Sequence, residues 1–165
     1  GQAVALNDGT TSIEVAKYLA DHYLRLTVLT NSLQIVNILK KASNFTVIIP
    51  SGVVDTEEGA IYGSACVRDI LKYNIDLAIL DVHLMSLESG IAGDSPEQSD
   101  VIAAMIQSSK KRAVVADHNK IKMTSHASSA CGLSCIDYLI TDSKLSSELR
   151  RSIEEKQIQI IMAKQ

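Results

Sequence analysis

The sequence predicts an α/β fold in which a mostly parallel central sheet carries helices on both faces. Three observations support this prediction. The expected strands are short, continuous apolar runs, which is typical of strands buried on both faces. Segments with helical spacing of apolar residues lie between them, and polar residues or glycine follow most runs. The expected strands cover residues 3–6, 26–29, 46–49, 77–80, 112–116, 138–141 and 158–162.

The first strand leads directly into a tight turn and a helix. Residues 3–6 are apolar, residues 7–9 are polar or glycine, and apolar residues recur at helical spacing over residues 13–19. Residues 10–12 carry hydroxyl groups and lie in the first helical turn, where backbone N–H groups have no intrahelical partner. Gly9 allows another group to approach this backbone closely. The turn is therefore predicted to bind an anion at the positive end of the helix dipole.

Start and stop signals place the other helices. Ser32 is a suitable N-cap for a helix over residues 33–41, which ends in two lysines. Pro96 at the first helical position, followed by an acidic residue, predicts a helix over residues 96–106. Two more helices are expected over residues 63–72 and 146–156.

The longest segment without periodicity covers residues 81–95. It contains two glycines and several polar residues. We expect an irregular loop there, of the kind that in compact domains is usually functional or mobile.

The composition indicates one soluble domain. The chain has 165 residues, enough to bury about two-thirds of its unfolded surface without disulfides. Its net charge is −3, and it has no tryptophan and one phenylalanine, so it is not expected to bind nucleic acid through its own surface. No apolar run approaches the ~20 residues that span a bilayer, so no membrane partner is expected. Cys66, Cys131 and Cys135 form an odd set without framework spacing, which favours a cytoplasmic location.

Ligands of open α/β sheets bind outside the carboxyl ends of the strands, so the polar segments that follow the strands should converge on one cleft. We expect a pocket for a phosphorylated small molecule there. The first helical turn would bind the phosphate, Asn31 and Ser32 would supply neutral hydrogen bonds, and Lys120 would add a positive charge. Asp8 and Asp81 would orient sugar hydroxyls. The candidate ligand-binding residues are Asp8, Gly9, Thr10, Thr11, Ser12, Asn31, Ser32, Gly52, Asp81, His83 and Lys120.

Simpler roles remain open for several of these residues. Thr10 or Thr11 would only cap a helix, Ser32 would do the same, and Lys120 would be a solvated loop charge. Catalysis requires a base or nucleophile oriented by a second group, and no motif positions the acidic side chains that follow the fourth strand. An enzyme is therefore the minority interpretation.

A metal or cofactor site is not expected. His118, His126, Cys131 and Cys135 resemble a loose ligand set, but Cys-x-x-x-Cys after a single histidine matches no structural zinc pattern. Cys131 and Cys135 are instead expected to be small core or loop residues.

Five segments together resemble the carboxyl-terminal sensor domain of the DeoR family of bacterial transcriptional regulators. The resemblance covers nearly the whole chain, and the fold of that domain is similar to ribose-5-phosphate isomerase and glucosamine-6-phosphate deaminase. Segments 114–120 and 136–142, with their order and spacing, are the most specific. The segments are 6–12 (LNDGTTS), 28–33 (VLTNSL), 96–106 (PEQSDVIAAMI), 114–120 (VVADHNK) and 136–142 (IDYLITD).

The resemblance implies that residues 1–165 form a single, non-catalytic sensor domain that binds a phosphorylated sugar. It would control a winged helix-turn-helix module that lies upstream in the full-length repressor, and DNA would be contacted only through that module. Repressors that read two-fold operators work as dimers or larger assemblies, so a homo-oligomer is expected. Residues 8–11 match the phosphate turn of the family, residues 31–32 its second loop, Gly52 its third loop and Lys120 the basic residue after the fifth strand.

The sequence departs from the family pattern at three places. A glycine pair is common where this chain has Ser51-Gly52, a Gly-x-Asn-Gly loop is usual at residues 81–84, and a lysine is often found at Ile102. Two rival interpretations stay open, and these departures would permit the second of them. One is a sugar-phosphate isomerase or deaminase with Asp81 or His83 as base, and the other is an oligomerisation domain whose pocket has decayed.

Overall fold

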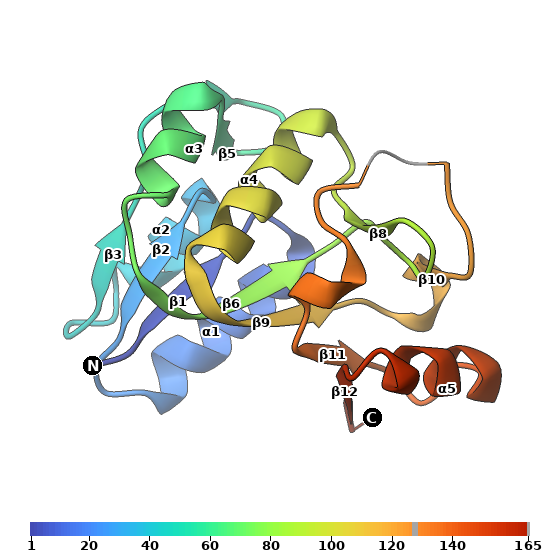
Figure 1. Cartoon of the computed structure of the whole chain (residues 1–165). Helices are drawn as coiled ribbons and strands as arrows, with labels where there is room; N and C mark the ends of the chain where they lie inside the picture. The colour runs from blue at the N-terminus through green and yellow to red at the C-terminus, as the bar shows by residue number, and fades with distance from the viewer. Residues whose placement is uncertain (127–128, 165) are drawn as a thin grey trace.

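The computed structural model describes residues 1–126 and 129–164 and confirms the predicted α/β architecture. Seven parallel strands form one sheet in the order β12-β11-β9-β6-β1-β2-β3 (Figure 1). Strand β1 lies inside the sheet, between β2 and β6, so the turn that follows it is flanked by segments from both neighbours. The strands are β1 (Ala3–Leu6), β2 (Thr27–Thr30), β3 (Thr46–Ile48), β6 (Ile75–Asp81), β9 (Ser109–Val115), β11 (Tyr138–Thr141) and β12 (Gln159–Met162).

In the part of the chain that the structure describes, five α-helices cover the two faces of this sheet, as predicted. Two of them, α1 and α2, pack with Val4, Leu6 and Val28 in one hydrophobic cluster. The other three pack with Ala5 and Leu29 in a second cluster, because neighbouring residues of a strand point to opposite faces. The helices are α1 (Thr10–His22), α2 (Leu33–Leu39), α3 (Ser64–Ile70), α4 (Pro96–Gln107) and α5 (Ser147–Glu155). Within the described ranges, none of the helices has the length and hydrophobicity that a membrane span requires.

Serine side chains explain where three helices begin. The hydroxyl oxygens of Ser32, Ser95 and Ser146 each accept a hydrogen bond of 3.2 to 3.3 Å from the backbone N–H three residues later. Each bond satisfies a donor that has no partner inside the helix. The predicted N-cap at Ser32 and the predicted helix start at Pro96 are both confirmed.

The prediction of an irregular loop over residues 81–95 is wrong. Two short strands, β7 and β8, form an antiparallel hairpin there, and β10 pairs with β7. A second hairpin, β4–β5, was also not predicted. Strands of two or three residues are too short to show periodicity, and distant segments supply part of their pairing. The added strands are β4 (Val53–Asp55), β5 (Ala60–Tyr62), β7 (Leu84–Ser86), β8 (Gly90–Ala92) and β10 (Ile121–Lys122).

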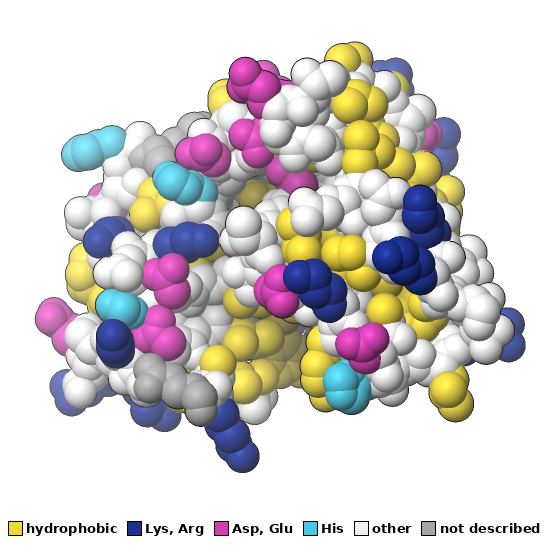
Figure 2. Space-filling view, turned by 180° about the vertical axis from the view of Figure 1, so that it is seen from behind, with side chains coloured by type: hydrophobic (Ala, Val, Ile, Leu, Met, Phe, Trp, Pro, Cys, Tyr) yellow, Lys and Arg dark blue, Asp and Glu magenta, His cyan; other side chains and the backbone are white. Residues whose placement is uncertain are grey.

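One face of the sheet is only partly covered. Beside α1, side chains of β6, β9, β11 and β12 line a hollow of about 400 Å³. Figure 2 shows hydrophobic side chains at the bottom of a depression on this side of the molecule. The apolar residues of its lining include Leu77, Ile79, Ala113, Ile140 and Ile161.

The two-face arrangement predicts unequal effects for two leucine substitutions. Leu6 is fully buried under α1 and α2, whereas Leu24 is 88% exposed. We expect Leu6→Ala to lower the free energy of unfolding by about 2–5 kcal/mol, because it leaves a cavity in a packed core. Leu24→Ala should change it by less than about 0.5 kcal/mol. Urea denaturation followed by far-UV circular dichroism measures both, and similar losses would contradict this packing.

Candidate functional site

A cleft of about 370 Å³ lies at the carboxyl ends of β1, β2 and β6. Segments that are far apart in the sequence meet there, as expected for a parallel sheet. The residues of the predicted site that line this cleft are Asp8, Gly9, Thr10, Ser32, Asp81, His83 and Lys120.

The other predicted residues, Thr11, Ser12, Asn31 and Gly52, do not line the cleft. The hydroxyl of Ser12 is buried and donates to Asn7 Oδ1 at 3.2 Å. Asn31 is fully buried, and it supports the site from beneath. At Gly52, an added Cβ would lie 2.5 Å from the carbonyl oxygen of Tyr62, so this glycine allows the backbone to pack against β5.

The Asp81 carboxylate occupies the amino end of α1. Its Oδ2 accepts a hydrogen bond of 2.9 Å from the backbone N–H of Thr11. A Cβ at Gly9 would lie 2.3 Å from the same oxygen, so glycine is needed there to admit the carboxylate. The position predicted for an external anion is therefore partly filled by an anion of the protein itself.

Asn7 joins β1 to β6 directly below this contact. Its side-chain amide donates to the Asp81 carbonyl oxygen at 2.7 Å, and its Oδ1 accepts from the Asp81 N–H at 2.8 Å. Asn7 is 2% exposed, so both bonds lie in a poorly solvated environment where hydrogen bonds are strong. These two hydrogen bonds fix the position of the Asp81 backbone relative to β1, and therefore relative to α1.

A second network orients Asp8. The Asn31 side chain accepts from the Asp8 N–H at 3.0 Å and donates to Asp8 Oδ1 at 2.9 Å and to the Ile61 carbonyl oxygen at 3.1 Å. The Tyr62 hydroxyl donates to Asp8 Oδ2. Burial, followed by the hydrogen bond to Asp8, raises the pKa of Tyr62 well above its usual value, so the hydroxyl stays protonated. Tyr62 was not predicted, because it lies on the short strand β5.

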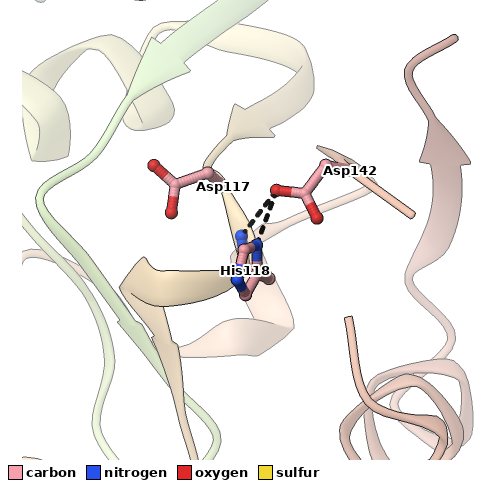
Figure 3. A group of neighbouring side chains, drawn as sticks. All are labelled: Asp117, His118 and Asp142. Atoms are coloured by element: carbon pink, nitrogen blue, oxygen red, sulfur yellow. Dashed lines mark hydrogen bonds and ion pairs between the residues drawn. The ribbon is translucent and has the colours of Figure 1, made fainter. Parts of the chain in front are cut away.

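Lys120 is positioned by the turn η1 (His118–Lys120) that follows β9. Asp142 Oδ2 accepts hydrogen bonds from the His118 N–H at 3.0 Å and meets the His118 ring Nδ1 at 2.9 Å (Figure 3). Asp117 caps the turn by accepting from the Asn119 N–H at 2.8 Å. Lys120 Nζ then lies 3.7 Å from Asp81 Oδ1. The loop after β11 thus helps to direct the lysine into the cleft.

The cleft is rich in carboxylates. Asp8, Glu58, Asp81 and Asp94 line it, together with one lysine, and His83 Nε2 lies 3.5 Å from Asp94 Oδ1. Glu58 lies in the turn of the β4–β5 hairpin, and Asp94 follows the β7–β8 hairpin, so recognising these two hairpins was the signal needed to place both residues. The lining residues that the sequence analysis missed are Ile13, Gln34, Glu58, Val82, Asp94 and Gln98.

Cys131 and Cys135, which were expected to be small core or loop residues, form a disulfide with each other. Their sulfurs are not available as metal ligands while bonded to each other. Asp117, His118 and Asp142 do bring possible ligand atoms within 4.8 Å of one another. Ile102, where the family often has a lysine, is a buried residue of α4 and does not line the cleft.

Comparison with known families shows which family this chain belongs to. Residues 1–143 match the model of the DeoR C terminal sensor domain. The chain belongs to this family. The resemblance seen in the sequence is therefore confirmed for most of the sensor domain.

Curated relatives of this sensor domain are transcriptional repressors. It is 33% identical over 144 residues to the transcriptional repressor AccR of Agrobacterium fabrum, with 87% of this chain and 55% of that protein covered. It is 33% identical over 142 residues to the HTH-type transcriptional repressor GlcR of Bacillus subtilis, with 86% and 54% covered. It is 30% identical over 142 residues to the glycerol-3-phosphate regulon repressor of Haemophilus influenzae, with 86% and 54% covered. The sensor domain spans little more than half the length of these relatives.

Among solved structures, the sensor domain is similar to ribose 5-phosphate isomerase from Plasmodium falciparum, with a TM-score of 0.50 and 13% sequence identity. The match covers 76% of this chain and 47% of that chain. At this identity the likeness concerns the fold alone, and it confirms the predicted ribose-5-phosphate isomerase-like fold.

The contact between Gly9 and Asp81 predicts a coupled pair of substitutions. We expect Gly9→Ala to lower the free energy of unfolding of the sensor domain by about 1–3 kcal/mol, because the new methyl group overpacks the Asp81 carboxylate. In an Asp81→Ala background the same change should cost less, as a double-mutant cycle measures. Gly132→Ala is the control, since it has ordinary backbone angles and no atom near its Cβ position. An equal cost of Gly9→Ala in both backgrounds would contradict the contact.

The contact between His118 and Asp142 predicts a pH-dependent effect. Hydrogen bonds from the His118 side chain and backbone lower the pKa of Asp142 from 3.8 to about 2. Because the folded pKa is the lower one, the stabilisation is complete above about pH 4 and is lost as the pH falls toward about 2. Asp142→Asn should therefore be less stable than wild type near neutral pH and equally stable near pH 2. Urea titrations across this range test it, and a difference that persists in acid would refute it.

Proposed function

We propose that residues 1–165 form the effector-binding domain of a DeoR-type transcriptional repressor, and that a phosphorylated sugar binds in the cleft. In this proposal the domain controls a winged helix-turn-helix module upstream of it, and the protein reaches DNA only through that module. The repressor would act in the cytoplasm as a homo-oligomer. Membership of the DeoR sensor family and the names of the curated relatives support this proposal.

One observation carries the phosphate part of the proposal. The amino end of α1 and the ammonium group of Lys120 face the same cleft. Thr10 opens the helix, so its N–H has no intrahelical partner, and its exposed side chain adds a hydroxyl donor. The 13-residue helix also presents the positive end of its dipole there. A phosphate placed beside Asp81, between Thr10 and Lys120, would receive all three contributions.

The carboxylates of the cleft are suited to bind the hydroxyl groups of a sugar phosphate. An ionised carboxylate only accepts hydrogen bonds, and the hydroxyl groups of a sugar supply donors for it. Asp8 is held in a fixed orientation by Asn31 and Tyr62, so it would meet a hydroxyl without first losing side-chain freedom. Glu58 and Asp94 lie on the same cleft and would accept further hydroxyls.

The proposed mechanism is a shift between populations. The effector would bind one arrangement of the subunits better than another, and the DNA-binding modules would change their spacing accordingly. The size of this shift is limited by the difference between the two affinities of the effector. We propose no catalytic step, because the curated relatives are named as repressors.

A thermal-shift screen with sugar phosphates tests the proposal. A ligand at 100 times its dissociation constant adds about 2.7 kcal/mol to the free energy of unfolding, which corresponds to roughly 5–10 °C for a domain of this size. Lys120→Gln should weaken the best ligand about 10- to 100-fold, because it removes a charge-assisted contact to phosphate.

Lys122→Gln is the matched control, since this lysine is exposed nearby in β10 and does not line the cleft. It should leave the affinity unchanged. No shift with any sugar phosphate would favour the decayed pocket, and turnover of a sugar phosphate that Asp81→Asn abolishes would favour an enzyme.

A further inference from the structure

The disulfide between Cys131 and Cys135 lies outside the cleft and has no part in the function proposed above. Both residues are partly buried on the segment that leads through η2 (Leu133–Cys135) toward β11. The third cysteine, Cys66, is completely buried on α3. The chain therefore has one cysteine pair near the surface and one thiol inside the core.

The fold does not depend on this crosslink for its connectivity. The bonded residues are separated by only 4 positions, and a short closed loop removes less entropy from the unfolded chain than a long one. Leu133 and Ile136 anchor the same segment in the large hydrophobic core without the help of the sulfurs. Opening the disulfide would thus leave the segment attached to the core. It would change how firmly residues 130 and 131, at the start of the segment, are held.

Those first residues hold the β7–β8 hairpin. The Ile91 N–H donates to the Cys131 carbonyl oxygen at 2.9 Å, and the Ala130 N–H donates to the Ile91 carbonyl oxygen at 2.8 Å. A Cβ at Gly90 would lie only 2.0 Å from the Cys131 carbonyl oxygen, so the two backbones pack without a gap. In Figure 1 the strand β8 and the segment that carries η2 lie close together on the same side of the molecule.

The base of that hairpin forms part of the cleft wall. The His83 N–H donates to the Ala92 carbonyl oxygen at 3.0 Å, at the point where the hairpin begins and ends. His83 and Asp94, just outside the hairpin, both line the cleft. A continuous path of backbone hydrogen bonds therefore connects Cys131 with the cleft wall through β8.

We propose that Cys131 and Cys135 form a reversible thiol–disulfide site that sets how tightly the β7–β8 hairpin is held beside the cleft. With hydrogen peroxide as oxidant, one thiolate attacks a peroxide oxygen to give a sulfenic acid, and the departing hydroxide takes up the proton that this thiol released to form water. The second thiolate attacks that sulfur and expels hydroxide, which takes up the proton released by the second thiol to form another water. Two thiols and one peroxide thus become one disulfide and two water molecules, with two electrons passing from sulfur to oxygen. A dithiol reductant reverses the change by thiol–disulfide exchange.

Cys66 does not take part in this chemistry. Burial raises the pKa of its thiol to about 11, so the reactive thiolate is scarce at neutral pH. Its position in the core also keeps it away from the other two sulfurs. Cys66 therefore serves as an internal reference for labelling experiments.

The test follows thiol labelling and hydrogen exchange in the folded chain. After reduction with dithiothreitol and removal of the reagent, N-ethylmaleimide should label two cysteines, and after treatment with hydrogen peroxide it should label none. The intact mass should fall by two hydrogen atoms on oxidation. Amide exchange over residues 82–94 should be several-fold faster in the reduced form, because the partners of Ile91 and His83 are held less firmly.

Two variants complete this test. Cys66→Ser should keep both responses, whereas Cys135→Ser should not lose two hydrogen atoms on oxidation, because Cys131 alone cannot form the disulfide, and should exchange at the reduced rate under all conditions. A pair that remains dithiol in excess peroxide, or a bond that dithiothreitol does not open in the folded chain, would overturn the proposal. Equal exchange of residues 82–94 in the two states would overturn the link to the cleft. No effector is needed, so these outcomes are independent of the sugar-phosphate proposal.

Discussion

The packing of the Asp81 carboxylate against the amino end of α1 is the constraint on which the rest of the site depends. It brings together the end of β6, the turn after β1 and the first turn of the helix. The close approach requires glycine at position 9. The buried side-chain amide of Asn7 holds the end of β1 and the end of β6 in register through two hydrogen bonds to the Asp81 backbone. Lys120 then balances part of the negative charge from a fourth segment. A helix terminus that is usually available to a ligand is here shared with a side chain of the protein.

This arrangement determines which ligands the cleft suits. A site with four carboxylates and one lysine attracts a bare anion poorly, because nearby like charges oppose it. A molecule that presents one phosphate toward Thr10 and Lys120, and hydroxyl groups toward the remaining carboxylates, satisfies both regions. Asp81 and His83, from residues 81–84, both line this cleft.

The turn of one hairpin outside the main sheet and the two ends of the other contribute residues to the cleft. Glu58 lies in the turn of β4–β5, and Asp94 follows β8. The β7–β8 hairpin is in turn held by the backbone around Cys131, so the wall is supported by a segment about forty residues further along the chain. Such long-range support is a means by which a change outside a pocket alters the pocket itself.

The sequence by itself determined the sheet, the helices and the main turns of this protein. Continuous apolar runs and hydroxyl caps such as Ser32 are local features, and the chain forms the same elements wherever such features occur. The parallel sheet that follows from this pattern also places seven of the predicted residues at one cleft, because the carboxyl ends of parallel strands meet at one edge.

Only the tertiary structure decided how those residues are used. The insertion of Asp81 into the end of α1, the Tyr62 contact to Asp8 and the pairing of Cys131 with Cys135 bring together residues whose interaction no local pattern shows. The same is true of the short strands β7, β8 and β10, which are too brief to have a period and are stabilised by partners elsewhere in the chain. Contacts of this kind depend on where folding places distant segments, and a reading of neighbouring residues does not contain that information.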